Sequence, residues 1–287
     1  MTDRLSPGHL RLAGSRLTMH AVVAATYAFL LLAPLVVIYY SFSPGVVLEG
    51  PAEGMTLRWY RNFAQQPRLV SGFGYSLLIA VFSSLAATAI GVPAALGLTR
   101  SQLPGRRLLL AVLLSPLTLP GIVLAIGILM VIVAIVQPLT HVRLVGGVLP
   151  LLAAHLIVTI PWVIRTVVAS LETMDITIEE AARGLGATAV DTFRLVTLPA
   201  IAPGVVAGAI FAFIVSFGNF ALSLFFTSGT VTTLPVAVFQ YIDQFQDPTV
   251  AAASSVVIAI TTIVVLVADR VAHFTRRPGA VGQEHRS

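Results

Sequence analysis

Residues 172–199 read ETMDITIEEAARGLGATAVDTFRLVTLP and interrupt an otherwise strongly apolar chain. This segment holds five of the twelve acidic residues of the protein. Its first half contains Glu180 and closes on a glycine pair that ends at Gly186, a pattern typical of a short helix with a glycine C-cap. The segment therefore begins with a short polar helix.

The second half of the segment predicts another short helix. It begins at Thr188 or Asp191, two residue types that cap helix N-termini, and it stops before Pro199. Apolar residues recur on one side of both helices, so the whole segment is an amphipathic helix–glycine–helix hairpin. Such a hairpin suits docking to a soluble protein; the alternative is a solvated connector without a special role.

The composition on both sides of this segment predicts an integral membrane protein. Of the 287 residues, 57% are hydrophobic and 10% are charged, against roughly 25% charged in soluble domains. The mean hydropathy is +0.94. These values exclude a typical soluble enzyme and a disordered chain. Six apolar runs are long enough to cross a bilayer as helices, at residues 21–42, 71–99, 108 to about 136, 144 to about 170, 201–226 and 249–268.

The predicted fold is accordingly all-α, a polytopic membrane protein with six transmembrane helices. Residues 21–272 form the membrane domain, with tails at 1–20 and 273–287. Twelve arginines fall in the segments that are cytoplasmic if the N-terminus is inside, and four fall in the opposite segments. Because positive charge marks cytoplasmic loops, both termini and the hairpin 172–199 are predicted to be cytoplasmic. A cleaved signal peptide is disfavoured, since the first apolar run is long and bulky residues follow it.

Two missing residue types exclude whole classes of chemistry. All seventeen basic residues are arginine, so the chain has no lysine for a P-loop or a Schiff base. Any ATP hydrolysis must come from a partner. The chain also has no cysteine, which excludes disulfides and thiolate metal sites. The arginines punctuate apolar runs instead of forming one patch, so we expect no nucleic-acid partner despite a pI near 10.2.

Two shorter features lie outside the six runs. The loop 43–68 carries Trp59, Tyr60 and Phe63, which is typical of an interfacial aromatic belt and compatible with a short amphipathic surface helix. Residues 234–239 form a short apolar element after a polar turn, either re-entrant or interfacial.

The hairpin resembles the EAA signature of permease subunits from binding-protein-dependent ABC importers. Glu180-Ala181-Ala182 is followed by Gly186 at the expected spacing, and Val196 stands where the pattern favours isoleucine. Leu198-Pro199 closes the motif. The resemblance extends to most of the chain, and its spermidine/putrescine-type branch is indicated by Ser216-Phe217-Gly218-Asn219-Phe220, Ser223-Leu224-Phe225, Thr233-Leu234-Pro235 and the stretch 247–252.

The resemblance implies a type I importer permease in the bacterial inner membrane. Its partners would be a second homologous permease, two ATPase subunits that bind ATP and Mg²⁺, and an extracytoplasmic solute-binding protein. The chain itself would hold no catalytic residue, cofactor or metal. In this family the hairpin enters a cleft of the ATPase, which implies an ATPase contact for Glu180, close seating for Ala181 and Ala182, a bend at Gly186, and an exit fixed by Leu198 and Pro199.

Polar residues within the apolar runs are candidates for the solute path. Ser216, Asn219 and Ser223 follow helical spacing and would share one face of the fifth run, although helix packing also favours such residues. His155 is more typical of a hydrogen-bonded interior histidine. The neutral Gly218-Asn219 pair disfavours spermidine and leaves room for a zwitterion or an amine-bearing anion. The branch resemblance implies a small polar solute of the polyamine, opine or aminophosphonate kind.

Two other classes of membrane protein compete with the importer. An ion-coupled secondary transporter usually needs ionisable groups at mid-membrane, and His155 alone fits that description. A membrane-embedded enzyme needs a constellation such as a nucleophile–base pair or HExxH, and the sequence contains none.

Overall fold

The structure is a computed structural model, and it describes residues 7–45, 54–101, 103–141 and 145–275. All regular elements in these ranges are helical. The arginines at positions 4, 143, 276, 277 and 286, which entered the topology prediction, lie outside the described residues. The chain forms two units, one from residues 1–65 with 244–258 and one from residues 66–243 with 259–287, and each is described by itself.

The first unit contains α1 (Pro7–Ser41) and α2 (Arg58–Gln65). The helix α2 confirms the short amphipathic helix expected in the loop 43–68. Trp59 is buried, and its Nε1–H donates to the Ser43 carbonyl at 2.6 Å. The hydroxyls of Ser41 and Tyr60 lie 2.7 Å apart. The aromatic residues that we assigned to an interfacial belt therefore also tie α2 to the end of α1.

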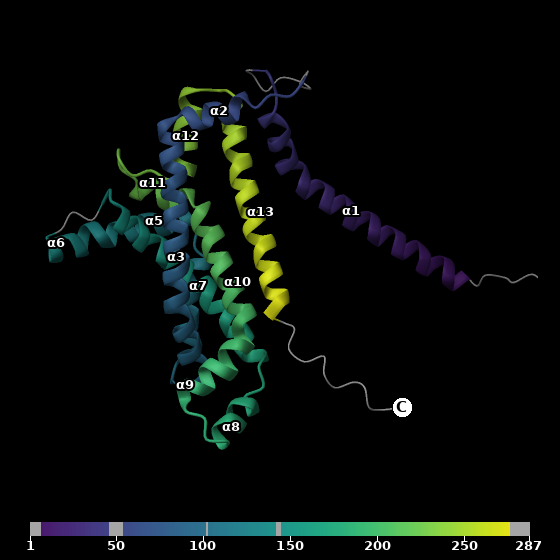
Figure 1. The fold of residues 1–287 in the computed structure, drawn as a ribbon, viewed down its shortest axis with the longest axis vertical. Coiled ribbons are helices and arrows are strands. Elements are labelled where there is room, and N and C mark those ends of the chain that lie inside the picture. The colour runs from purple at the N-terminus through teal and green to yellow at the C-terminus, as the bar shows by residue number, and fades with distance from the viewer. Residues whose placement is uncertain (1–6, 46–53, 102, 142–144, 276–287) are drawn as a thin grey trace, which may run out of the picture. The chain divides into compact units, whose positions relative to one another are not determined.

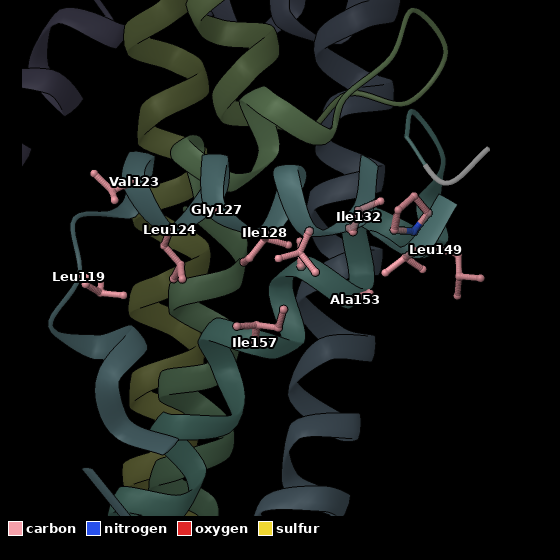
Figure 2. A pocket seen from close by; sticks show the side chains of 13 residues that line it. Leu119, Val123, Leu124, Gly127, Ile128, Ile132, Leu149, Ala153 and Ile157 are labelled. Carbon is pink, nitrogen blue, oxygen red and sulfur yellow. The ribbon is translucent and has the colours of Figure 1, made fainter. Parts of the chain in front are cut away.

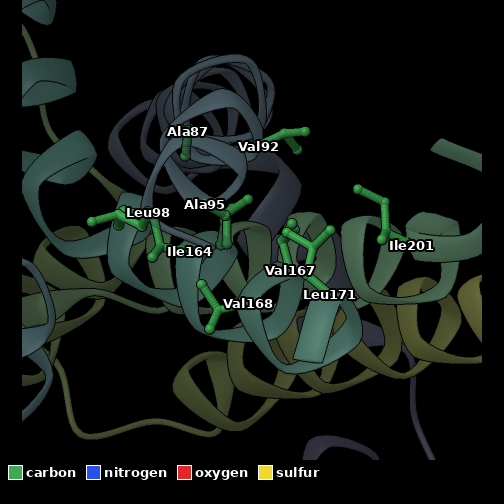
Figure 3. Close-up of a cluster of buried hydrophobic side chains, with 11 residues drawn as sticks. Ala87, Val92, Ala95, Leu98, Ile164, Val167, Val168, Leu171 and Ile201 are labelled. Atoms are coloured by element: carbon green, nitrogen blue, oxygen red, sulfur yellow. The ribbon is translucent and has the colours of Figure 1, made fainter. Parts of the chain in front are cut away.

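The core of the second unit is built by α3 (Pro67–Arg100), α7 (Val148–Thr173) and α10 (Leu198–Phe217), which pack side by side (Figure 1). Figure 3 shows one of its buried clusters, where Val167 and Leu171 of α7 lie among side chains from the other two helices. The members of this cluster are aliphatic or alanine, so it needs no polar partner: Ala87, Val92, Ala95, Leu98, Val163, Ile164, Val167, Val168, Leu171, Ile201 and Ala212.

Two glycines, four residues apart, let α10 approach α7 closely. A Cβ on Gly204 would overlap the Ser170 hydroxyl and lie 2.8 Å from the Thr166 carbonyl oxygen. A Cβ on Gly208 would overlap the Thr166 hydroxyl and lie 2.9 Å from the Val163 Cα. Small residues at this spacing are the usual means by which membrane helices bring their backbones together.

The third apolar run is not one helix, which corrects the prediction for residues 108–136. It begins as α4 (Arg106–Leu114), passes a 3₁₀ turn at Ser115–Leu117, and restarts as α5 (Gly121–Val131). A π-turn (Ile132–Val136) and α6 (Gln137–Thr140) follow, and this part runs crosswise to α3 in Figure 1. The cause of the break is the pair Pro116 and Pro120, because each proline lacks the N–H that would continue the helix.

The fifth apolar run is also broken. The helix α10 ends at Phe217, and α11 (Phe220–Phe226) starts after Gly218 and Asn219. A loop then leads to α12 (Leu234–Gln244), which confirms the expected short apolar element, and to α13 (Thr249–Thr275). Six helices in the described residues are long and apolar enough to cross a membrane, beginning at Thr18, Pro67, Gly121, Val148, Ala189 and Thr249. The predicted six-span, all-α class is therefore confirmed, although the bounds of individual spans differ.

Candidate functional site

The predicted hairpin forms one end of the second unit, opposite α11 and α12 (Figure 1). Its first helix is α8 (Thr177–Gly184), and its second begins as α9 (Ala189–Thr192). Gly186 lies between them with a φ of +92°, a conformation that side chains with a Cβ rarely adopt. The bend predicted at this glycine is confirmed.

Thr188 is the N-cap of α9, as one of the two sequence alternatives proposed. Its side-chain oxygen accepts from the Asp191 N–H at 3.2 Å, and the Asp191 carboxylate accepts from the Thr188 N–H at 3.3 Å. This reciprocal pair is a capping box and satisfies two backbone donors at the helix start. It fixes the direction in which the chain leaves the bend.

The second hairpin helix does not stop before Pro199, and that prediction is wrong. It continues from α9 through a π-turn at Phe193–Thr197 directly into α10, so that one helix runs from Ala189 to Phe217. A proline disrupts the α-helical bond pattern of the turn before it, and that turn here has π geometry. The second half of the hairpin is thus a helical extension of the fifth span instead of a separate loop.

The residues of the EAA pattern are mostly exposed. Glu180 and Ala181 face outward, Ala182 is half-buried, and Leu198 and Pro199 lie at the exposed start of α10. Three apolar side chains accompany them on the surface of this end: Leu185 is 91% exposed, Leu195 75% and Val190 57%. An exposed acidic residue together with uncovered apolar side chains at the same end of the unit is the composition of a protein contact surface.

The neighbour of Glu180 has a different role that sequence reasoning missed. Glu179 is buried, and its Oε1 accepts from the Arg100 guanidinium at 3.0 Å and from the Thr197 hydroxyl at 2.8 Å. Consecutive helical residues point about 100° apart, so Glu179 can face inward while Glu180 faces outward. No local signal identified its partner, because Arg100 lies 79 residues away.

Other acids of the hairpin lie at its surface. Glu172 approaches Arg106 at 3.7 Å with 61% of its side chain exposed, an arrangement that contributes little stability. Asp175 accepts from the Thr177 N–H at 3.0 Å at the start of α8, and this backbone hydrogen bond lowers the pKa of the Asp175 carboxyl. The Asp175 side chain is therefore charged at neutral pH and complements the helix N-terminus.

The candidate path residues lie at the opposite end of α10. Ser216 and Ser223 are buried and both contact His155 of α7, at 2.8 Å from its Nδ1 and 3.4 Å from its Nε2. Ser83 of α3 donates to Ser216 at 2.9 Å. Asn219 lies in the helix break, where its Oδ1 accepts from the Leu222 N–H at 2.9 Å and caps α11.

This geometry corrects the expectation that Ser216, Asn219 and Ser223 share one helix face. The two serines converge on His155 from different helices, whereas Asn219 is half-buried at the cap between them. His155 is a hydrogen-bonded interior histidine in the structure. It joins α7 to both sides of the break and thereby holds the two helix segments together.

Two cavities differ sharply in character. One of about 740 Å³ lies between α5 and α7 and is lined by aliphatic side chains such as Leu124, Ile128 and Ile157 (Figure 2). It offers no polar group to a polar solute. The other, of about 350 Å³, is lined by Arg68 and Ser71 of α3, by Gln240 of α12, and by hydroxyl side chains of the loop 227–232.

Known transport proteins are similar to this chain in sequence. The sequence model of the binding-protein-dependent transport system inner membrane component matches residues 87–277. The putrescine transport system permease protein PotI of Escherichia coli (strain K12) is 28% identical over 84% of this chain and 86% of its own length. The sulfate transport system permease protein CysT of Salmonella typhimurium (strain LT2) is 31% identical over 73% of this chain and 78% of its own length.

A solved structure shows the same fold. A chain of a bacterial ABC transporter involved in the import of the acidic polysaccharide alginate superposes with a TM-score of 0.73 at 12% identity, covering 94% of this chain and 99% of that chain. The family match spans more than half of the sequence and includes the hairpin, α7, α10 and the last part of α3, from residue 87. This chain therefore belongs to the inner membrane components of binding-protein-dependent transport systems.

Proposed function

We propose that this chain is one permease subunit of an ATP-driven importer that moves a small polar solute into the cytoplasm. In this assembly it pairs with a second homologous permease. Two ATPase subunits bind ATP and Mg²⁺ on the cytoplasmic side, where both termini of the chain also lie. A solute-binding protein delivers the solute from the outside.

The observation that carries the proposal is the hairpin. Its bend at Gly186 and its capping box are ordered, yet Glu180 and Leu185 are exposed and project away from the described part of the chain. An isolated chain gains nothing from leaving a leucine 91% exposed at an ordered turn. A soluble partner with a basic group in an apolar cleft would cover both side chains.

Coupling follows from the continuity of the helix. The segment from Ala189 to Phe217 joins the hairpin to the helix break at Asn219 as one continuous helix. Closure of the ATPase dimer would move the hairpin, and the helix would carry that displacement to the far end of the bundle as a rigid-body motion. The break at Gly218 and Asn219 is the place where α10 and α11 can change their relative angle.

The solute class is proposed more coarsely than the transport mode. The relatives named above carry putrescine or sulfate, so similarity alone leaves the sign of the solute charge open. Asn219 is neutral, and the acids of the described membrane helices lie at their ends, as with Glu172 and Asp269. An opine or an aminophosphonate-like solute fits a path that relies on neutral polar groups, and a polyamine is the third candidate because a putrescine permease is among the relatives.

The test is reconstitution of the permease pair, the ATPase and the binding protein in proteoliposomes. We expect solute uptake that requires both ATP and the binding protein. Uptake that instead follows a proton or sodium gradient without ATP would contradict the proposal and favour an ion-coupled transporter. A binding assay on the partner solute-binding protein identifies the solute for this experiment.

A further inference from the structure

Within the described part of the chain, a partly buried polar junction of three residues fastens the hairpin to the membrane core. Glu179 of α8 receives the guanidinium of Arg100, the last residue of α3, and the hydroxyl of Thr197, the last residue of the π-turn. The Glu179 side chain is 5% exposed and that of Arg100 26%. We name these three residues the anchor.

We infer that the anchor orients Glu180 toward the ATPase and transmits the movement of the hairpin to α3 as well as to α10. Glu179 is a positioning residue in this account, since it acts through its neighbour and through the two helices that it joins. The inference rests on the proposed function, because it assigns a role within the coupling between hairpin and membrane core.

The anchor gives movement of the hairpin a direct path to α3. The hairpin is covalently continuous with α10 through the π-turn, but α3 is separated from it in sequence by α4 to α7. The Arg100–Glu179 pair is a direct polar link between α8 and α3. Without it, movement of α8 would reach α3 indirectly, through α7 and α10, which pack against α3.

The energetics of the ion pair also favour an orienting role for the anchor. A buried ion pair gives up the hydration of both charges, so its net contribution to stability is small, whereas it fixes geometry strongly. The buried Nε of Arg100 has no hydrogen-bond partner among the described residues, which weakens the case for a purely stabilising pair. The anchor is thus better suited to set an orientation than to hold the fold.

The backbone just before α10 supports the same role. The π-turn at Phe193–Thr197 changes the helical register just before α10. Thr197 is the last residue of this turn, and its hydroxyl donates a hydrogen bond to the Glu179 carboxylate. Single π-turns inside α-helices are frequent at functional positions. Here the turn places the start of α10 and the inward acid of α8 in direct contact.

The experiment compares variants in the reconstituted complex, with solute moved per ATP hydrolysed as the readout. Glu179→Gln keeps the size of the side chain and an acceptor for Thr197 but removes the charge. We expect complexes of normal subunit composition in which the solute moved per ATP falls about tenfold, the size expected when one partner of a buried charged contact is lost and part of the loss is recovered by relaxation.

The chain supplies matched controls. Glu172→Gln removes the exposed ion pair with Arg106 and should leave the ratio unchanged. Thr197→Val removes only the hydroxyl and should lower the ratio, and Thr197→Ser should restore it. A merely structural role would reduce the amount of assembled complex but would not change solute moved per ATP in the complexes that form.

A distance measurement keeps the inference testable if transport is too low to quantify. The chain has no cysteine, so a cysteine introduced at Thr177 on α8 and another at Gly97 on α3 would be the only sites that react with a spin label. The distribution of distances between the two labels should be narrow in the labelled parent and broad when Glu179→Gln or Thr197→Val is added.

The outcomes separate the two proposals. A parent complex that shows no ATP-dependent uptake refutes the proposed function. Suppose instead that the parent is active, but that Glu179→Gln and Thr197→Val match Glu172→Gln both in solute moved per ATP and in distance distribution. That result refutes the role of the anchor and leaves the proposed function standing.

Discussion

The hairpin and the three-helix core fix their helices by opposite means. In the part of the core that lies away from His155, Gly204 removes the side chain that would separate α10 from α7, and an aliphatic cluster packs the three helices together. In the hairpin, geometry depends on directed polar groups, namely the capping box at Thr188 and the buried carboxylate of Glu179. The core therefore resists deformation, whereas the hairpin holds a defined shape while keeping its outer surface free for a partner.

The largest effect is expected at the outer surface of the hairpin. Glu180→Ala should weaken coupling by about 2–5 kcal/mol, or roughly 30-fold and more, because the charged partner in the ATPase cleft would be left buried and unpaired. The measurement is ATPase stimulation by loaded binding protein in the purified complex. The subunit should still reach the membrane in normal amounts, and unchanged stimulation would remove Glu180 from the coupling role.

A smaller effect is expected from the core. Gly204→Val should lower the stability of the folded subunit by about 1–3 kcal/mol, since the added side chain overlaps Ser170 and must push α10 from α7. Thermal unfolding of the purified subunit in detergent measures this loss. Gly97→Val is the matched control, because no atom lies within 4 Å of its added Cβ. Equal behaviour of the two variants would contradict close packing as the principle of the core.

The helix break between the two ends of the bundle gives the next test. Asn219→Leu removes the cap of α11 and a polar group from the candidate path, and uptake should fall about fivefold, as for a lost cap of about 1 kcal/mol. Asn219→Ser keeps a capping oxygen. Uptake that falls in both variants assigns Asn219 to the path, whereas a loss confined to leucine shows that Asn219 acts as a cap.

The smallest effect is expected at the hairpin bend. Thr188→Ala removes one half of the capping box and should destabilise the start of α9 by about 1 kcal/mol. Hydrogen exchange of the Asp191 amide should become roughly fivefold faster, while amides of α7 should be unaffected. Exchange that stays at the parent rate would mean that contacts of the π-turn, and not the cap, hold α9 in place.

The sequence predicted what depends on long patterns and local signals. Hydropathy identified six spans, the glycine signature placed the bend at Gly186, and the local sequence named Thr188 as one of two possible caps. It missed the breaks near Pro120 and at Gly218, because a hydropathy window averages over the one or two residues that end a helix. The spacing argument for Asn219 failed for the same reason.

The missed contacts have a common cause. The anchor joins Glu179 to Arg100, and the histidine cluster joins His155 to Ser216 and Ser223. Each link spans tens of residues and depends on the packing of α3, α7 and α10, which no local pattern encodes. Sequence reasoning named the outward acid of the hairpin through a family resemblance and left the inward acid without a role.

The most direct measurement of the central claim asks what the hairpin touches. The chain has neither lysine nor cysteine, so a thiol-to-amine cross-linker attached at a new cysteine cannot react with a side-chain amine of the chain itself. Leu185→Cys lies at the exposed bend, and Leu85→Cys on α3, 63% exposed in the parent, is the matched control. The account predicts a cross-link to the ATPase subunit from position 185 and none from position 85. Equal products from both positions, or no product from position 185, would contradict it.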